Sequence, residues 1–350
     1  MGLTHAIINS PADWRASAIG ARSDWIHRLS DPEIDEIESA LACVKEKGIG
    51  IALVNRENFP LELFPRLVEK AHRILEHDCG MFIIRGLPVE RHPVEDMRLM
   101  YWALGLYLGR AVTQSSKGDV LGDVRDMSRF NDGRGRGYQS RRRLEFHTDS
   151  CDVVGLLVVR TAKQGGRSMI ASSVALHNQM LREAADLVEP LYGVFSGYSP
   201  GERAGRYWTQ PVFSMQDGYF ACKTGYVYFR LAAEKFPEKI PALTGQQIKA
   251  LELFQDIANR PDMHLSFLFE PGDLQLLNNH VMLHARTDFD DYEEEDKKRH
   301  LLRLWLSVPN SRPLSPLMKD AYRDVAPGAW RGGYPSASDK IVYHSNVTLD

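Results

Sequence analysis

Two histidines and an aspartate could form a metal site in this chain. His147 and Asp149 are separated by one residue, so in an extended segment both side chains point to the same side and could reach one ion. A third ligand could come from far downstream, where His280 and His284 lie close together in the sequence. Two histidines and one carboxylate on one face of a metal, with the other positions open, is the arrangement that holds Fe(II) in non-haem oxygenases.

Each of these residues also has an ordinary structural interpretation. On the pair alone, His147 would be a histidine at a strand edge that is hydrogen-bonded to the nearby Asp149. His284 could be a histidine of the protein core, and spacing does not choose between it and His280 as the third ligand.

A strand expected over residues 299–308 places two arginines on one face. Alternation puts Arg299 and Arg303 on one side with Leu301 and Trp305, and a row of leucines on the other. A buried arginine needs an anion partner, and its planar fork suits a carboxylate that is held in two places. A metal beside it fits a co-substrate that chelates the metal at one end and carries a carboxylate at the other, as 2-oxoglutarate does. The alternative is a structural ion pair with an acidic side chain.

The composition is that of a globular protein without a general affinity for polyanions. The 350 residues are 43% apolar and 25% charged, with a net charge of -3, so a large core is expected and attraction to nucleic acid or membranes is not. An arginine-rich tract at 134–143 is balanced by an acidic run at 290–296, and both are expected as loop surface. We therefore expect a small-molecule substrate, with no nucleic-acid or membrane partner, and leave open a homo-oligomer.

The cysteines and the N-terminus favour a cytoplasmic protein. Four widely spaced cysteines form no CxxC pair, which argues against a zinc ribbon or a dithiol motif and favours reduced thiols. The chain opens on no basic-then-apolar signal pattern, and no apolar run approaches the length of a membrane helix.

Predicted helices dominate the early part of the chain, and predicted strands dominate from His147 onward. Helices are expected at 31–47, 62–77, 93–108, 174–187 and 244–259, strands at 81–84, 153–159, 168–173 and 299–308, and hairpins at 213–223 and 265–277. The pattern predicts a mixed α+β fold, an antiparallel double-sheet roll buttressed by helices.

Three segments together resemble the taurine/2-oxoglutarate dioxygenase family (TauD/TfdA-like). They are Phe146-His147-Thr148-Asp149, Gly165-Gly166-Arg167-Ser168, and Asn279-His280-Val281-Met282-Leu283-His284 followed by Arg299 and Arg303. The ordered set is specific, and the similarity extends over residues 80–308.

The resemblance implies a double-stranded β-helix core of the jelly-roll, cupin-like kind. By motif position, it implies iron on His147, Asp149 and His284. It also implies that Arg299 holds the distal carboxylate of 2-oxoglutarate, with help from the hydroxyl of Ser168. The implied reaction uses Fe(II), 2-oxoglutarate and O2 to oxidise an unactivated C–H bond, with hydroxylation, desaturation or cyclisation as outcomes and succinate and CO2 as by-products.

The sequence also suggests how the chain is organised. We expect a single domain over residues 1–350. Residues 1–79 form an N-terminal helical wrap, and residues 80–308 form the oxygenase core with a helical insertion near 174–262. Residues 309–350 form a C-terminal tail, which is a candidate lid over the pocket; the alternative is a disordered end.

The residues that bind the substrate are predicted less directly. Arg303 resembles a residue that binds an acidic group of the substrate in some members of the family, and Gln114 favours the same chemistry. Tyr138, Ile341 and Tyr343 are candidate pocket walls, although ordinary packing explains each of them equally well. We therefore expect a small polar substrate that is acidic or amino-acid-like.

Two other functions fit the same residues. A zinc hydrolase could use the same three ligands with a metal-bound water, and its activity would need neither O2 nor 2-oxoglutarate. A non-catalytic small-molecule-binding protein could share the fold, since fold does not fix function, but the complete ligand set argues against it.

Overall fold

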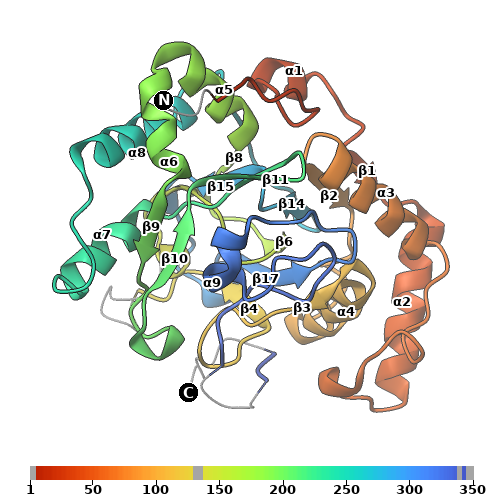
Figure 1. The fold of residues 1–350 in the computed structure, drawn as a ribbon. Coiled ribbons are helices and arrows are strands. Elements are labelled where there is room, and N and C mark those ends of the chain that lie inside the picture. The colour runs from red at the N-terminus through yellow and green to blue at the C-terminus, as the bar shows by residue number, and fades with distance from the viewer. Residues whose placement is uncertain (1–4, 129–136, 337–340, 344–350) are drawn as a thin grey trace.

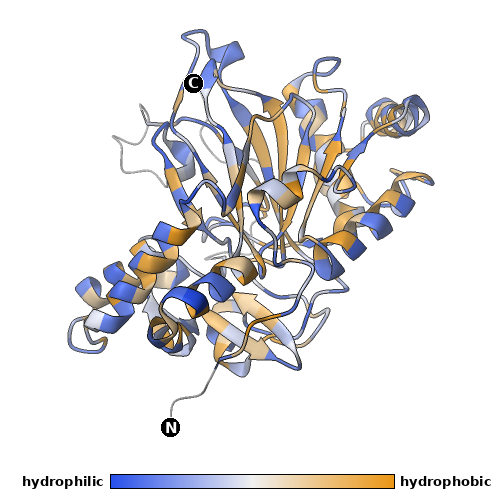
Figure 2. Ribbon diagram, turned by 90° about the horizontal axis from the view of Figure 1, so that it is seen from above, coloured by the Kyte–Doolittle hydropathy of each residue, from blue (hydrophilic) through white to orange (hydrophobic). Residues whose placement is uncertain are grey.

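A computed structural model describes residues 5–128, 137–336 and 341–343 of the chain. The described chain is a mixed α/β fold, in which helices lie outside a group of central strands (Figure 1). The central strands are mostly hydrophobic, whereas the outer helices carry both hydrophobic and hydrophilic residues (Figure 2). No described helix has both the length and the apolar character to cross a membrane.

The larger sheet, which we call the major sheet, has seven strands. Its order is β1-β2-β14-β6-β17-β3, and β4 also pairs with β17. Only the pair of β1 and β2 is parallel among these strands, so the expected antiparallel arrangement holds for the rest. The strands are β1 (Ile26–Arg28), β2 (Met81–Arg85), β3 (Arg110–Ala111), β4 (Leu121–Val124), β6 (Val153–Arg160), β14 (Leu274–Asn278) and β17 (His300–Ser307).

The smaller sheet, the minor sheet, has four strands in the order β13-β8-β15-β5. They are β5 (Leu144–His147), β8 (Ser168–Ser172), β13 (His264–Phe267) and β15 (Met282–Arg286). Where β15 pairs with β5, His284 lies opposite His147. The minor sheet therefore places two of the predicted metal ligands side by side, although 137 residues separate them in the sequence.

The described residues also form three two-stranded sheets. They pair β9 (Val194–Gly197) with β10 (Trp208–Pro211), β11 (Phe213–Gln216) with β12 (Tyr219–Cys222), and β7 (Gln164–Gly165) with β16 (Phe289–Asp290). The hairpin expected at 213–223 is confirmed by β11 and β12, which turn at Asp217 and Gly218 with positive φ. The segment between β8 and β13, where an insertion was expected, contains β9 to β12 as well as helices.

The helices cover the outer faces of the sheets. They are α1 (Ala16–Gly20), α2 (Asp31–Glu46), α3 (Phe64–His77), α4 (Val94–Leu108), α5 (Ser173–Glu183), α6 (Glu189–Tyr192), α7 (Tyr226–Lys235), α8 (Gly245–Ala258) and α9 (Lys319–Tyr322). Thr244 caps α8, because its hydroxyl accepts a hydrogen bond from the Gln247 amide and the Gln247 side-chain oxygen accepts one from the Thr244 amide. The helix α7 was not predicted from the sequence.

The two faces of β17 differ as the alternation predicts. The leucine row packs under α4, where a Cβ added to Gly105 would lie 2.5 Å from Leu304 Cδ1. The opposite row lines an internal cavity and consists of Arg299 just before the strand, Leu301, Arg303 and Trp305. One apolar face thus attaches the strand to the core, which leaves the other free to carry polar chemistry.

The hairpin predicted over 265–277 is wrong. The strand β13 pairs with β8 in the minor sheet, whereas β14 pairs with β2 and β6 in the major sheet. The turn between them is fastened to the major sheet, because Leu87 N donates to Gly272 O at 3.1 Å and Arg85 pairs with the buried Asp273 at 2.7 Å. A local turn signal does not distinguish a hairpin from a crossing between sheets, because remote partners decide which sheet each strand joins.

This crossing predicts unequal costs for two glycine substitutions. Gly272 and Gly218 both have positive φ, but a Cβ on Gly272 would lie 2.3 Å from Leu87 O, whereas a Cβ on Gly218 meets nothing within 4 Å. Gly218→Ala should lower the free energy of unfolding by about 1 kcal/mol through backbone strain, and Gly272→Ala should lower it by clearly more. Urea denaturation of the two variants measures this, and equal losses would contradict the tight crossing.

Candidate metal centre and the cavity around it

His147, Asp149 and His284 come together at one end of the minor sheet. Their potential ligand atoms all lie within 4.8 Å of one another, and no other group of His, Cys, Asp or Glu does so in the described chain. The Asp149 carboxylate lies 4.0 Å from His147 Nε2 and 3.8 Å from His284 Nε2, and the two imidazole centroids are 4.3 Å apart. These separations are too long for direct hydrogen bonds, so the ordinary interpretation of the pair as a bonded histidine and aspartate does not describe the site.

Hydrogen bonds from outside the cluster orient its members. His147 Nδ1 donates to Glu145 O at 2.8 Å, which directs Nε2 toward Asp149. The Asp149 amide donates to Asn279 Oδ1 at 3.2 Å, and Trp305 Nε1 donates to Asp149 Oδ2 at 2.8 Å. Partners of this kind fix the direction of metal ligands.

Electrostatics sets the protonation states that a metal requires. Burial would raise the pKa of Asp149, but the charges of Arg303, His284 and His147 and the hydrogen bond from Trp305 outweigh burial and lower this pKa to about 2. Burial, helped by the positive fields of His147 and Arg303, lowers the pKa of His284 to about 3. At neutral pH the carboxylate is therefore ionised and the His284 imidazole is neutral, as metal ligation demands.

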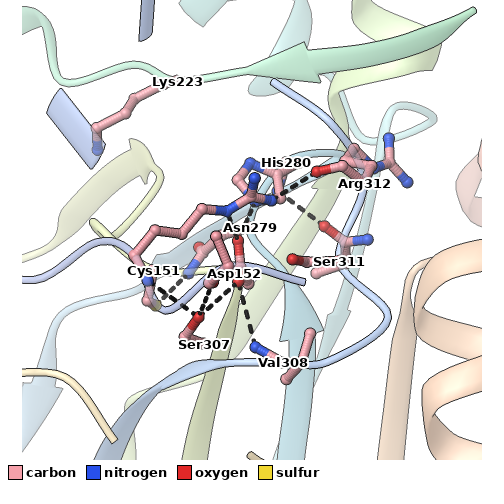
Figure 3. Close-up of polar contacts among 12 residues, drawn as sticks. Cys151, Asp152, Lys223, Asn279, His280, Ser307, Val308, Ser311 and Arg312 are labelled. Carbon is pink, nitrogen blue, oxygen red and sulfur yellow. Dashed lines mark hydrogen bonds and ion pairs between the residues drawn. The ribbon is translucent and has the colours of Figure 1, made fainter. Parts of the chain in front are cut away.

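His280, the competing candidate, belongs to a separate buried network (Figure 3). Its Nε2 lies 2.8 Å from Asp152 Oδ1, which also accepts from Arg331 Nε at 2.7 Å. The second oxygen of Asp152 accepts from the Ser307 hydroxyl and the Val308 amide, both at 3.2 Å. His280 is thus a core histidine with a satisfied partner, and it is not part of the three-residue cluster.

This network also secures the loop that carries Asp149. Asn279, next to His280, donates from its amide to Asp152 O at 2.9 Å and from Nδ2 to Cys151 Sγ at 2.9 Å, while its Oδ1 accepts from Asp149 (Figure 3). One asparagine side chain therefore connects the loop from Asp149 to Asp152 with the start of the strand that carries His284.

The cluster faces a cavity of about 450 Å³. One part of its wall, which we call the arginine end, consists of Gly166, Ser168, Gln275, Arg286 and Arg299. Another part, the lysine end, consists of Trp208, Gln210, Lys223, Thr224 and residues 226–230. Apolar and aromatic side chains complete the lining, including Val124, Tyr138, Leu156, Phe269, Leu301, Trp305 and Tyr334.

The guanidinium of Arg299 at the arginine end has no directly paired carboxylate in the described chain. No carboxylate of the described chain lies within 4.0 Å of the Arg299 guanidinium, and its Nη1 is buried without a hydrogen-bond partner. Burial and the neighbouring charge of Arg286 lower the pKa of Arg299 to about 9. Gln275 accepts from the Ser168 hydroxyl at 3.2 Å, while its Nε2 also lacks a partner. Asp291 acts on this charge from a distance, because its carboxylate accepts from the Arg299 amide at 2.8 Å and does not pair with the guanidinium. A direct structural ion pair therefore does not explain Arg299.

Arg303 is engaged with the metal cluster. Its Nη1 lies 3.5 Å from Asp149 Oδ2, and its Nε donates to Gln114 Oε1 at 2.7 Å. Its guanidinium lies 4.4 Å from the ring centroid of Tyr138 and 5.0 Å from that of Trp305. Tyr138 thus lines the cavity as predicted from the sequence, whereas Gln114 is not among the lining residues and contacts Arg303 instead.

Among the described residues of the C-terminal tail, the cavity is lined by Tyr334, which the sequence did not indicate. Tyr334 lines the cavity and packs against Trp305 with a centroid separation of 5.8 Å. Ile341 is 56% exposed, and Tyr343 packs edge-on against Trp102 at 4.8 Å. Neither is among the residues that line the cavity, so the structure does not place them as pocket walls.

The arginine tract is at the surface where it is described. Arg134 and Arg136 lie outside the described residues. Arg141 pairs with Asp126 at 2.9 Å, and Arg143 pairs with Glu145 at 3.2 Å.

Sequence reasoning missed the whole lysine end. Lys223 is buried, and its Nζ donates to Asp149 O at 3.3 Å and to the Ser150 hydroxyl at 3.1 Å. Burial lowers the pKa of Lys223 to about 8. The only signal in the sequence was a lone lysine directly after the apolar strand 219–222, which is equally typical of a solvated strand end.

Comparison with known proteins agrees with the geometry. The family described as "Taurine catabolism dioxygenase TauD, TfdA family" matches residues 49–305. The chain belongs to this family. It is therefore an oxidoreductase of the dioxygenase class, and the resemblance inferred from the motifs is confirmed.

Relatives cover most of this TauD/TfdA family chain. It is 34% identical to FR-33289 synthase of Streptomyces rubellomurinus, over 85% of this chain and 90% of the relative. It is 29% identical to the taurine hydroxylase-like protein SAT17 of Stachybotrys chartarum, over 85% of this chain and 79% of the relative.

Solved structures share the fold at low sequence identity. Asparagine oxygenase in complex with Fe(II), 2S,3S-3-hydroxyasparagine and succinate is 16% identical, with a TM-score of 0.63 over 81% of this chain and 93% of that one. The non-haem iron oxygenase OrfP in complex with Fe and α-ketoglutaric acid is 12% identical, with a TM-score of 0.61 over 80% of this chain and 93% of that one.

The two histidine environments predict opposite effects on metal binding. His147→Ala, Asp149→Ala and His284→Ala should each abolish stoichiometric Fe(II) binding, whereas His280→Ala should retain it because His280 points into the Asp152 network. Anaerobic equilibrium dialysis with colorimetric iron determination measures this. Loss of iron in His280→Ala together with its retention in His284→Ala would show that the third ligand is wrongly assigned.

The Asp152 network predicts a large loss of stability when its carboxylate is removed. Asp152→Ala would leave the fully buried Arg331 without its anion and should lower the free energy of unfolding by about 3–5 kcal/mol. Asp256→Ala, at an exposed position of α8, is the control and should change it by less than about 0.5 kcal/mol. Similar losses in both variants, measured by denaturant titration, would remove the structural role of the network.

Proposed function

We propose that this family member is an Fe(II)- and 2-oxoglutarate-dependent dioxygenase that oxidises an unactivated C–H bond of a small, acidic or amino-acid-like substrate. One observation carries the proposal: a cluster of two histidines and a carboxylate faces the same cavity as Arg299, a buried guanidinium with no directly paired carboxylate in the described chain. The solved relatives hold hydroxylated amino acids, which supports the substrate class.

The cluster fits iron by its donor set. One ionised carboxylate and two imidazole nitrogens, one of them held neutral by burial, are the donor set that Fe(II) takes in non-haem oxygenases. We propose that His147, Asp149 and His284 hold the metal. When bound, Fe(II) with 2-oxoglutarate and O2 supplies the oxidation of the C–H bond, and 2-oxoglutarate is converted to succinate and CO2.

The arginine end fits the distal carboxylate of 2-oxoglutarate. The free Nη1 of Arg299 can donate a charge-assisted hydrogen bond to a carboxylate oxygen, and the hydroxyl of Ser168 lies in the same wall. The unpartnered Nε2 of Gln275 offers a further donor. The second positive charge, on Arg286, strengthens the local field for an anion.

Other residues of the chain prepare the site. Arg303 keeps Asp149 ionised, and Trp305 fixes the direction of the same carboxylate. Because the guanidinium of Arg303 is already shared between Asp149 and Gln114, we propose that its main role is to support the metal ligand. The apolar lining excludes water around these charges and so strengthens their interactions.

We also propose that the two sheets are the halves of a double-stranded β-helix in one domain. Consecutive core strands alternate between the sheets: β5 is in the minor sheet, β6 in the major and β8 in the minor. The later strands β13, β14, β15 and β17 alternate in the same way. Such alternation rolls a chain into two facing sheets, with the metal cluster at the mouth of the roll.

The alternative function as a zinc hydrolase does not explain the buried cations of the arginine end. A hydrolase needs the three ligands and a water, but it has no second carboxylate to place on Arg299. The test is anaerobic addition of Fe(II) and 2-oxoglutarate, which should give a visible metal-to-ligand charge-transfer band. Absence of the band, with zinc-dependent hydrolysis that needs no 2-oxoglutarate, would overturn the proposal.

Arg299 predicts how the enzyme depends on 2-oxoglutarate. A charge-assisted hydrogen bond contributes about 1.5–3 kcal/mol, so Arg299→Ala should raise the apparent KM for 2-oxoglutarate by an order of magnitude or more. Arg182→Ala, at an exposed position of α5, removes the same charge away from the cavity and should leave this KM unchanged. Succinate formation measures both, and a normal 2-oxoglutarate titration in Arg299→Ala would remove Arg299 from the site.

A further inference from the structure

The lysine end of the cavity has no role in the chemistry proposed so far. We propose that Lys223, Thr224 and the first turn of α7 bind an oxyanion of the substrate, either a carboxylate or a tetrahedral group such as a sulfonate or phosphonate. The inference rests on the proposed function, because it names the substrate group that this dioxygenase recognises.

Lys223 is a buried cation without a neutralising partner. It is 5% exposed, and its two hydrogen-bond acceptors, Asp149 O and the Ser150 hydroxyl, are uncharged. No carboxylate of the described chain lies within 4.0 Å of its Nζ. The Asp149 carboxylate is already bound by Trp305 and Arg303. An ammonium group has three N–H donors, and two of them bind Asp149 O and Ser150. The Tyr322 ring, 5.5 Å from Nζ, is a further neutral neighbour that supplies no anion.

Thr224 supplies an unpartnered donor at the same place. It is 2% exposed and lines the cavity, and its Oγ1 has no hydrogen-bond partner. Its backbone is fixed, because Thr224 N donates to the Thr148 hydroxyl at 3.1 Å and Thr224 O accepts from Thr148 N at 3.3 Å. A buried hydroxyl held in this way without a protein partner indicates that a ligand satisfies it.

The N-terminus of α7 adds the positive end of a helix dipole. The helix begins at Tyr226 directly after Thr224 and Gly225, and Gly225 has no side chain that could cap the first turn. Residues 226–230 line the cavity, so the uncapped end of a ten-residue helix belongs to the same wall as Lys223. Free amides and the dipole at a helix N-terminus favour an anion.

The position of this wall separates the substrate anion from 2-oxoglutarate. Arg299 and Trp305 are six residues apart along the β17 segment, or about 20 Å, and the Trp305 indole contacts Asp149. Lys223 contacts the backbone of that same Asp149. An anion at Lys223 would therefore lie close to the metal ligands, which places the oxidised carbon within a few bonds of the acidic group.

The test is anion binding to the full chain loaded anaerobically with Fe(II) and 2-oxoglutarate, which occupies Arg299. Acetate, methanesulfonate and methylphosphonate are titrated separately by calorimetry at constant ionic strength, so that a planar carboxylate is distinguished from a tetrahedral oxyanion. At least one probe should bind saturably. Lys223→Gln keeps a donor for Asp149 O but removes the charge, and should raise the Kd of that probe about 10- to 100-fold.

Thr224→Val keeps the inference testable if Lys223→Gln folds poorly. Valine has the shape of threonine, and the hydroxyl that it removes makes no hydrogen bond within the protein, so Tm should not fall. The Kd of the probe should rise about 2- to 10-fold. Lys239→Gln is the control for net charge, because Lys239 is exposed, and it should leave the Kd unchanged.

The outcomes separate this inference from the proposed function. Absence of the charge-transfer band in the unmodified protein would contradict the proposed function itself. A normal band with no saturable binding of any probe, or with the same Kd in Lys223→Gln, Thr224→Val and the unmodified protein, would overturn the oxyanion site alone.

Discussion

An excess of buried positive charge governs the cavity of this protein. Arg286, Arg299, Arg303 and Lys223 are cations in its wall, while Asp149 is the buried carboxylate among the described lining residues. Burying unpaired charge costs several kcal/mol per ion, and a divalent metal on Asp149 would add to the positive side. Two anionic ligands would neutralise this excess positive charge. The cations lie in two separate parts of the wall, so one anion would bind at the arginine end and the other at the lysine end.

The fold explains how these charges are held in place. The apolar row of β17 attaches the strand under α4, so the opposite row can present arginines to the interior. Pairing of β5 with β15 sets His147 beside His284. The loop that carries Asp149 depends on Asn279 and the Asp152 network, so the metal ligands rest on a rigid polar core.

The sequence predicted the parts of the site that depend on short-range alternation or on an ordered motif. The face of residues 299–305 follows from a period of two, and the ligand pair at 147–149 lies within one extended segment. Whether His280 or His284 is the third metal ligand depends on the path of the backbone after Asn279. The spacing of these residues in the sequence does not determine that path. No sequence motif marked Lys223 as a site residue. Its place in the site depends on its contact with Asp149, which lies 74 residues away in the sequence. The turn at Gly272 was misjudged because its strands find partners in different sheets.

A crystal structure grown anaerobically with Fe(II) and 2-oxoglutarate tests the central claim most directly. Anomalous scattering at the iron edge should place one metal between His147 Nε2, the Asp149 carboxylate and His284 Nε2. The distal carboxylate of 2-oxoglutarate should lie on Arg299 Nη1, and Lys223 should remain available to the substrate. A metal bound through His280, or a 2-oxoglutarate whose distal carboxylate lies on Lys223 instead of Arg299, would contradict this account.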